Sequence, residues 1–86
     1  MNEVAVVTGA ASGIGRGIAH RLAEEYKVIL VDINAVTLPL VEKEITDAGH
    51  QAYSVLGDVG KRFTHQSARK LAESKGNLIS WVNCAG

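Results

Sequence analysis

The sequence has few residues that cross-link or interrupt a small protein: one cysteine, one proline and 5% aromatic residues among 86. The single cysteine, Cys84, excludes an internal disulfide, and the three histidines are too dispersed for metal-ligand spacing. Nine basic residues balance nine acidic ones, so the chain lacks the basic surface of a nucleic-acid-binding protein. We therefore expect neither a metal site nor a nucleic-acid partner.

Long apolar runs are also absent. No apolar stretch approaches the roughly 18 residues that a membrane helix requires, so we expect no membrane partner. The start of the chain lacks the basic residues and continuous apolar segment of a signal peptide, which predicts a cytoplasmic protein. With 47% hydrophobic and 21% charged residues, the composition is typical of a folded domain. A chain of 86 residues suffices for one small domain.

The first half of the chain has the pattern of a βαβ unit. Residues 4–7 and 28–31 are runs rich in valine and isoleucine without polar alternation, which is typical of strands buried on both faces of a parallel sheet. Between them, Ile14, Ile18 and Leu22 recur every four residues, with Ala19 and Ala23 beside them, and predict a helix with one apolar stripe. Strand, helix and strand within so short a segment form a βαβ unit.

The second half continues the same alternation. A helix is predicted to begin near Thr37, because Pro39 must lie in its first turn, with Asn34 as the alternative cap. Gly49 suits the C-terminal end of this helix. The remaining signals are helix positions Leu38, Val41 and Ile45, a strand over residues 51–56, helix positions Phe63, Ala68, Leu71 and Ala72, and a strand over residues 78–83. The predicted order is therefore β-α-β-α-β-α-β.

Residues 8–15, Thr-Gly-Ala-Ala-Ser-Gly-Ile-Gly, lie where the first strand ends and the first helix begins. The free N–H groups and partial positive charge of a helix N-terminus suit a pyrophosphate, and glycines let the backbone approach it. A Walker loop is excluded because no Gly-Lys-Ser/Thr follows. The strict pattern G-x-G-x-x-G also fails, since Ile18 occupies its last position. The pattern that fits is T-G-x-x-x-G-x-G.

With this pattern the sequence resembles the short-chain dehydrogenase/reductase family. Three further motifs agree in order and place. Asp32 closes the second strand, Asp58-Val59 follows the third, and residues 83–86, Asn-Cys-Ala-Gly, resemble the family's N-N-A-G. The resemblance covers the whole chain and implies an α/β fold with a partial Rossmann-like, doubly wound parallel sheet of strand order 3-2-1-4. Residues 1–86 would then form the N-terminal part of a single NAD(P)-binding Rossmann domain.

The resemblance also implies a dinucleotide cofactor. The residues expected to contact it are Gly9, Ser12, Gly13, Ile14, Gly15, Asp32, Ile33, Asp58, Val59, Asn83, Ala85 and Gly86. Asp32 would accept hydrogen bonds from the adenosine ribose hydroxyls and would repel a 2′-phosphate. NADP-preferring relatives carry a basic residue at the positions of Ser12 or Ile33, and this chain does not. We therefore expect NAD(H), with NADP less favoured.

Most of these residues also have a structural interpretation. The glycines could form a turn without a ligand, Asp32 could cap the following turn, and Asp58 and Ser12 could cap helices. Asn83 is expected to tie the central strands together first, and to line the nicotinamide side second. Cys84 departs from the family's asparagine, and we expect it to behave as a small buried hydrophobe.

No catalytic residue is assigned. The family's Tyr-x-x-x-Lys is absent, since neither Tyr26 nor Tyr53 has a lysine four residues later. The resemblance therefore implies an N-terminal cofactor-binding fragment, inactive alone, of an NAD-dependent oxidoreductase acting on a small-molecule alcohol or carbonyl substrate. The alternatives are a short non-catalytic dinucleotide-binding or assembly module and a degenerate remnant. Because family members are commonly dimers or tetramers, we expect a homo-oligomer. A chain ending at Gly86 would expose its fourth strand as an apolar sheet edge.

Overall fold

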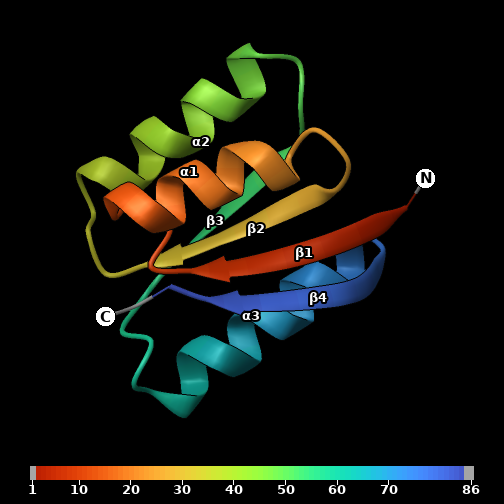
Figure 1. Ribbon diagram of the computed structural model, residues 1–86. Coiled ribbons are helices and arrows are strands. Elements are labelled where there is room, and N and C mark those ends of the chain that lie inside the picture. Colours follow the sequence, from red (N-terminus) through yellow and green to blue (C-terminus); the bar gives the residue numbers. More distant parts are fainter. Residues whose placement is uncertain (1, 85–86) are drawn as a thin grey trace.

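The computed structural model describes residues 2–84, in which strands and helices alternate in the predicted order. The elements are β1 (Glu3–Thr8), α1 (Gly13–Leu22), β2 (Lys27–Asp32), α2 (Thr37–Asp47), β3 (Ala52–Leu56), α3 (Arg62–Lys75) and β4 (Asn77–Asn83). All strand pairs are parallel, and the sheet order β3-β2-β1-β4 confirms the prediction. Figure 1 shows α1 and α2 on one face of the sheet and α3 on the other, so the sheet is doubly wound.

The sheet is buried from both sides because successive side chains of a strand point to opposite faces. In β2, Val28 and Leu30 belong to the core layer under α1 and α2, whereas Ile29 and Val31 belong to the layer against α3. All four side chains are almost completely buried. The run therefore shows no polar alternation, as the sequence indicates for a strand covered on two faces.

Helix α1 packs on the sheet through small residues. Gly15 and Ala19 are its buried positions, and Ile18 and Leu22 are partly buried beside them. The predicted stripe is wrong at Ile14, whose side chain is 76% exposed. The reason is that α1 contacts the sheet along its small residues, each one position after a large one. Small side chains let the helix backbone approach the strands closely.

Helix α2 begins at Thr37, as predicted, and the side chain of Asn34 caps it. The Asn34 Oδ1 atom accepts hydrogen bonds from the backbone N–H groups of Val36 at 3.0 Å and Thr37 at 2.9 Å. The helix ends before Gly49, whose φ of 91° lies in the left-handed region that glycine adopts readily. Both ends of α2 therefore follow from polar and glycine residues that the sequence displays.

Helix α3 buries Thr64, Ala68 and Ala72 against the sheet. The prediction that Phe63 lies on this apolar face is wrong, because its side chain is 77% exposed. Adjacent helix positions differ by about 100°, so a helix that buries position 64 directs position 63 toward solvent. Thr64 fits the buried position because it lies against Gly57, where an added Cβ would come within 2.7 Å of Thr64 Oγ1.

Strand β4 lies at one edge of the described sheet and pairs with β1 alone. The register shifts between Val4 and Ala5 of β1, which leaves Ile79 as an extra residue of β4, and its side chain is 42% exposed. Trp81, two residues later, packs against the core layer next to α3. Among the helices of residues 2–84, none is both long and apolar enough to cross a membrane.

Candidate functional site

The carboxyl ends of the four parallel strands lie side by side and form the carboxyl edge of the sheet, and the glycine turn lies at this edge between β1 and α1. Gly9 has a φ of 68°, a left-handed conformation that suits glycine. Its carbonyl oxygen accepts hydrogen bonds from Ser12 N at 3.1 Å and from Ser12 Oγ at 2.6 Å. Ser12 Oγ in turn accepts a hydrogen bond from Gly15 N at 3.2 Å. Ser12 is therefore the N-cap of α1, which is one of the two roles considered for it.

The first two N–H groups of α1 are available to a ligand. Those of Gly13 and Ile14 have no hydrogen-bond partner within residues 2–84. A Cβ added at Gly13 would meet no atom within 4 Å, so the space beside this helix end is open. Free donors, the positive end of the helix dipole and open space together suit an anion such as a pyrophosphate.

Asp32 joins the glycine turn to the end of β2. Its Oδ2 atom accepts a hydrogen bond from Ala11 N at 2.9 Å, and its Oδ1 atom accepts one from Asn34 N at 3.0 Å. A backbone hydrogen bond of 3.1 Å from Ala10 N to Val31 O anchors the same turn a second time. A carboxylate has about four acceptor sites, so Asp32 can accept further hydrogen bonds beside the N-terminus of α1.

The turn after β3 is attached to the same place. Gly57 N donates a hydrogen bond of 3.0 Å to the backbone oxygen of Asp32. Asp58 Oδ1 accepts a hydrogen bond from Gly60 N at 2.8 Å, while the residue stays exposed. Val59 packs its side chain against the core layer next to α3. The Asp58 carboxylate therefore stabilises its own turn and remains accessible at the edge of the sheet.

Asn83 ties the ends of β1 and β4 together, as predicted. Its Oδ1 atom accepts hydrogen bonds from Thr8 Oγ1 at 2.9 Å and from Trp81 Nε1 at 3.1 Å. Cys84 N donates to Thr8 O at 3.1 Å, and the Cys84 side chain packs, partly buried, against the core layer under α1 and α2. The last two predicted contact residues, 85 and 86, lie outside the described residues.

Donors and acceptors thus occupy separate zones along this edge. The free N–H groups gather at the start of α1, and the carboxylates of Asp32 and Asp58 lie at the ends of β2 and β3. Ile33, which follows Asp32, is 67% exposed. Within residues 2–84, no group of three or more His, Cys, Asp or Glu side chains could hold a metal ion. The edge suits a ligand with an anionic group beside α1 and hydroxyl groups beside Asp32.

Sequence reasoning missed two contacts that build this edge. Nothing singled out Thr8 as the partner of Asn83 or Ala11 as a donor to Asp32. The bond from Asn34 N to Asp32 Oδ1, in contrast, is the capping of the following turn that the sequence allowed for Asp32. The two missed contacts join residues far apart in the chain. The predicted strand order, which brings the ends of β1, β2 and β4 together, was the one available signal for them.

A cluster of charged side chains links α1 to α2. Arg16 donates hydrogen bonds to Glu44 through both Nε, at 3.1 Å, and Nη2. His20 Nε2 lies 2.8 Å from Glu44 Oε1. The hydrogen bond from Arg16, followed by that from His20, lowers the pKa of Glu44 to about 2. The bond to Glu44 raises the pKa of Arg16. Arg16 is therefore held against α2.

This cluster should make the stability of the chain depend on pH. The pKa of Glu44 is lower in the folded chain than its ordinary value of 4.5, so the stabilisation that its carboxylate gives the folded chain is fully present above pH 4.5. That contribution is lost as the pH falls from there through about 2, where the folded carboxylate becomes protonated. The partners are partly exposed, so solvent screens the interaction and the effect is small.

Glu44→Gln is expected to lose stability less steeply than the wild type over this acidic range. Urea unfolding midpoints measured at a series of pH values would give both slopes. Glu42→Gln, on the same helix, is the matched control and should follow the wild type. Identical slopes for the Glu44 variant and the wild type would contradict the role of this cluster.

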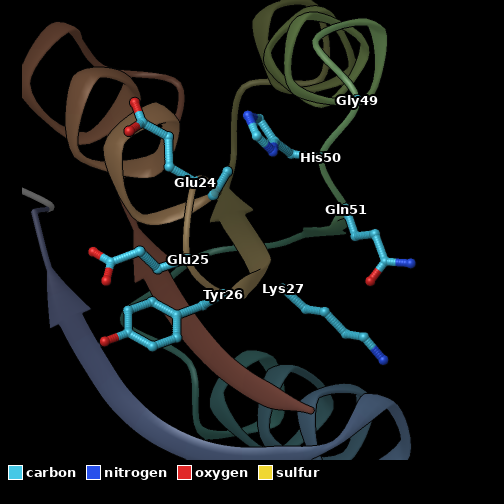
Figure 2. Close-up of a pocket in the computed structure, with 8 residues that line it drawn as sticks. Glu24, Glu25, Tyr26, Lys27, Gly49, His50 and Gln51 are labelled. Carbon is cyan, nitrogen blue, oxygen red and sulfur yellow. The ribbon is translucent and has the colours of Figure 1, made fainter. Parts of the chain in front are cut away.

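A hollow lies at the opposite edge of the sheet, where β2 and β3 begin. This pocket, of about 290 Å³, is lined by residues of the turns that precede these two strands. Figure 2 shows that its polar side chains diverge, since Glu25 and Tyr26 extend away from Lys27 and Gln51. The edge with the glycine turn is therefore the stronger candidate site.

Comparison with known proteins agrees with this geometry. The family model described as short chain dehydrogenase matches residues 3–86. The diacetyl reductase, (S)-acetoin forming, of Staphylococcus epidermidis is 40% identical over 88 residues, which cover 100% of this chain and 34% of that protein. The crystal structure of a hydroxysteroid dehydrogenase from Escherichia coli superposes with a TM-score of 0.90 and 35% identity, covering 98% of this chain and 37% of its own.

A metagenomic short-chain oxidoreductase in complex with NADP superposes with a TM-score of 0.87 and 36% identity, covering 99% of this chain and 39% of its own. The chain spans about a third of the length of the curated diacetyl reductases that it matches. Because the family match includes the glycine turn, all four strands and all three helices, this chain belongs to the short-chain dehydrogenase family.

Proposed function

We propose that this chain is the NAD-binding portion of an oxidoreductase that transfers a hydride between the cofactor and a small-molecule alcohol or carbonyl substrate. The observation that carries the proposal is the hydrogen bond from Ala11 N to the Asp32 carboxylate, which places an acidic acceptor beside the free donors of α1. A dinucleotide requires both, since its pyrophosphate binds a helix N-terminus and its ribose hydroxyls bind an acid. Membership of the short-chain dehydrogenase family supports the reaction class.

The pyrophosphate would lie at the start of α1. The N–H groups of Gly13 and Ile14 would donate to it, because they have no partner in the described part of the chain. Gly9, Ser12 and Gly15 would shape the turn that presents these donors. Gly13 would leave the space that the phosphate oxygens require, since a Cβ there meets nothing.

The rest of the cofactor would extend along the same edge. Asp32 would accept hydrogen bonds from the adenosine ribose, with Ile33 beside it. The Asp58-Val59 turn would contact the adenine. Asn83, together with residues 85 and 86, would line the nicotinamide side. When bound, the cofactor supplies or accepts the hydride, and the residues of this chain bind and orient it.

The charges at this edge favour NAD(H) over NADP(H). The Asp32 carboxylate would repel a 2′-phosphate, and neither Ser12 nor Ile33 offers a cation to bind one. Arg16, the basic residue closest in sequence to the glycine turn, is paired with Glu44 on α2. One structural relative was solved with NADP, so the proposal depends on this chain's own side chains rather than on its relatives.

Calorimetric titration with NAD⁺ and NADP⁺ tests this proposal, and Ile33→Arg is the most informative variant. Asp32→Ala also removes the hydrogen bonds to Ala11 and Asn34, so a loss of binding would have two explanations. The Ile33 side chain is 67% exposed, so arginine fits there without disturbing the core. We expect the wild type to prefer NAD⁺ and Ile33→Arg to gain about 10-fold or more in NADP⁺ affinity, because a charged hydrogen bond contributes about 1.5–3 kcal/mol.

Leu40→Arg is the matched control, because it adds the same charge to an exposed position of α2. It should not change the preference between the two cofactors. A chain that is folded by circular dichroism and binds neither dinucleotide would overturn the proposed function. A wild type that prefers NADP⁺ would overturn the choice of cofactor alone.

A further inference from the structure

His65 of α3 and Trp81 of β4 form a stacked pair close to the turn after β3. Their ring centroids are 5.5 Å apart and their planes differ by 7°. The indole is also held at its edge, because Trp81 Nε1 donates a hydrogen bond of 3.1 Å to Asn83 Oδ1. The stack therefore holds the imidazole ring in one plane relative to the sheet.

The same imidazole reaches the backbone of the turn. His65 Nε2 lies 2.6 Å from the carbonyl oxygen of Val59. A carbonyl oxygen only accepts hydrogen bonds, so Nε2 must carry the hydrogen and donate it. The stack on Trp81 and the bond to Val59 together fix both the orientation and the donor atom of His65.

The carbonyl that His65 holds belongs to the peptide between Val59 and Gly60. Gly60 N donates to Asp58 Oδ1 at 2.8 Å, and Lys61 N donates to Asp58 O at 3.0 Å. The Val59 side chain packs against the layer next to α3, and the bond from His65 attaches the turn to α3 a second time, at the Val59 carbonyl, one residue after Asp58.

We propose that His65 is a positioning residue for the adenine end of the cofactor site, acting through the Val59 carbonyl while stacked on Trp81. This inference rests on the proposed function, in which the Asp58-Val59 turn contacts adenine. His65 does not touch the cofactor itself. It fixes the turn before the ligand arrives, so that binding does not have to order the Val59–Gly60 peptide.

A purely structural role is the competing explanation, and the two differ in what a substitution changes. His65 and Trp81 line a hollow of about 260 Å³ formed by residues of α3 and β4, so His65 is not part of the tightly packed core. His65→Phe keeps an aromatic ring for the stack but removes the donor. His65→Gln removes the ring but keeps an N–H donor at a similar distance from the backbone.

The test measures the affinity of the 86-residue chain and its variants for NAD⁺, AMP and nicotinamide mononucleotide by calorimetry. We expect His65→Phe to weaken AMP and NAD⁺ binding about fivefold, the effect of one hydrogen bond, and to leave nicotinamide mononucleotide binding unchanged. His65→Gln should retain AMP affinity within about twofold of the wild type. His50→Phe, at the opposite edge of the sheet, is the matched control and should change none of the three.

The fluorescence of Trp81, the one tryptophan of the chain, reports whether the aromatic contact persists in each variant. Unchanged AMP affinity in His65→Phe would overturn the inference, as would an equal loss for AMP and nicotinamide mononucleotide. If His65→Phe does not fold, a His65→Gln variant that loses AMP binding overturns it, and one that retains binding supports it. A folded wild type that binds none of the three ligands would overturn the proposed function together with this inference. Binding by the wild type with no effect of His65→Phe would overturn this inference alone.

Discussion

Replacing Gly15 with alanine is expected to destabilise the chain by about 3 kcal/mol, as overpacking against rigid backbone does. An added Cβ would overlap the carbonyl oxygen of Gly9 and lie 2.7 Å from its carbonyl carbon. Both atoms belong to a left-handed turn whose oxygen is bonded twice by Ser12. The clash can be relieved only if α1 moves away from β1 or the turn opens. Urea unfolding followed by circular dichroism would measure the loss, and NAD⁺ affinity should fall in parallel.

Two other glycines of α1 are matched controls. A Cβ at Gly13 or Gly17 would meet no atom within 4 Å. Gly17→Ala should stabilise the chain by about 0.5–1 kcal/mol, because alanine is the better helix former. Gly13→Ala should change stability little and yet weaken NAD⁺ binding, because its methyl group enters the space proposed for the pyrophosphate. Equal effects of alanine at all three positions would refute the importance of the close approach at Gly15.

Ile29→Ala is expected to lower the free energy of unfolding by about 3–4 kcal/mol. Ile29 is completely buried in the second strand of the sheet, where it packs with Val6 and Ala68 in the layer next to α3. The loss combines the transfer free energy of the deleted methyl groups with that of the cavity left between strand and helix. The whole free energy of unfolding of a small domain is about 5–15 kcal/mol, so this variant should unfold at a much lower urea concentration than the wild type.

Ile14→Ala makes the same chemical change at an exposed position. The Ile14 side chain is 76% exposed, so its truncation should change the free energy of unfolding by no more than about 0.5 kcal/mol. The contrast between Ile29 and Ile14 isolates burial from residue type. Comparable losses in the two variants would mean that the described packing of the sheet is wrong.

The fold was largely predictable because its two central strands are continuous apolar runs, glycines lie in its turns, and the one proline marks the first turn of α2. The strand over residues 28–31 and the helix start at Thr37 were found within one residue of their positions in the structure. Periodicity failed at Ile14 and Phe63 for a common reason. The predicted faces were extended to the nearest large apolar residue, whereas α1 and α3 contact the sheet through small residues such as Ala19 and Ala68, which were predicted beside the first stripe and within the second face and which allow closer packing.

The candidate site was predictable in its sequence motifs but not in its internal contacts. The glycine turn and Asp32 could be recognised from their spacing and from the resemblance to the family, and the structure joins them by the hydrogen bond from Ala11 N. The pairing of Arg16 with Glu44 and the stack of His65 on Trp81 left no such signal. They depend on how α1 and α2, or α3 and β4, lie against each other, and single residues do not encode that arrangement locally.

The end of β2 has a consequence for protein engineering. Asp32 is hydrogen-bonded to the glycine turn, to the loop that precedes α2 and to the turn that follows β3. Three surface loops, which normally vary independently of one another, are thus attached to one residue. Their amide protons should therefore exchange with solvent as one cooperative unit. A chimera that transplants any one of these loops from a relative must also carry a compatible end of β2, or it will loosen the other two.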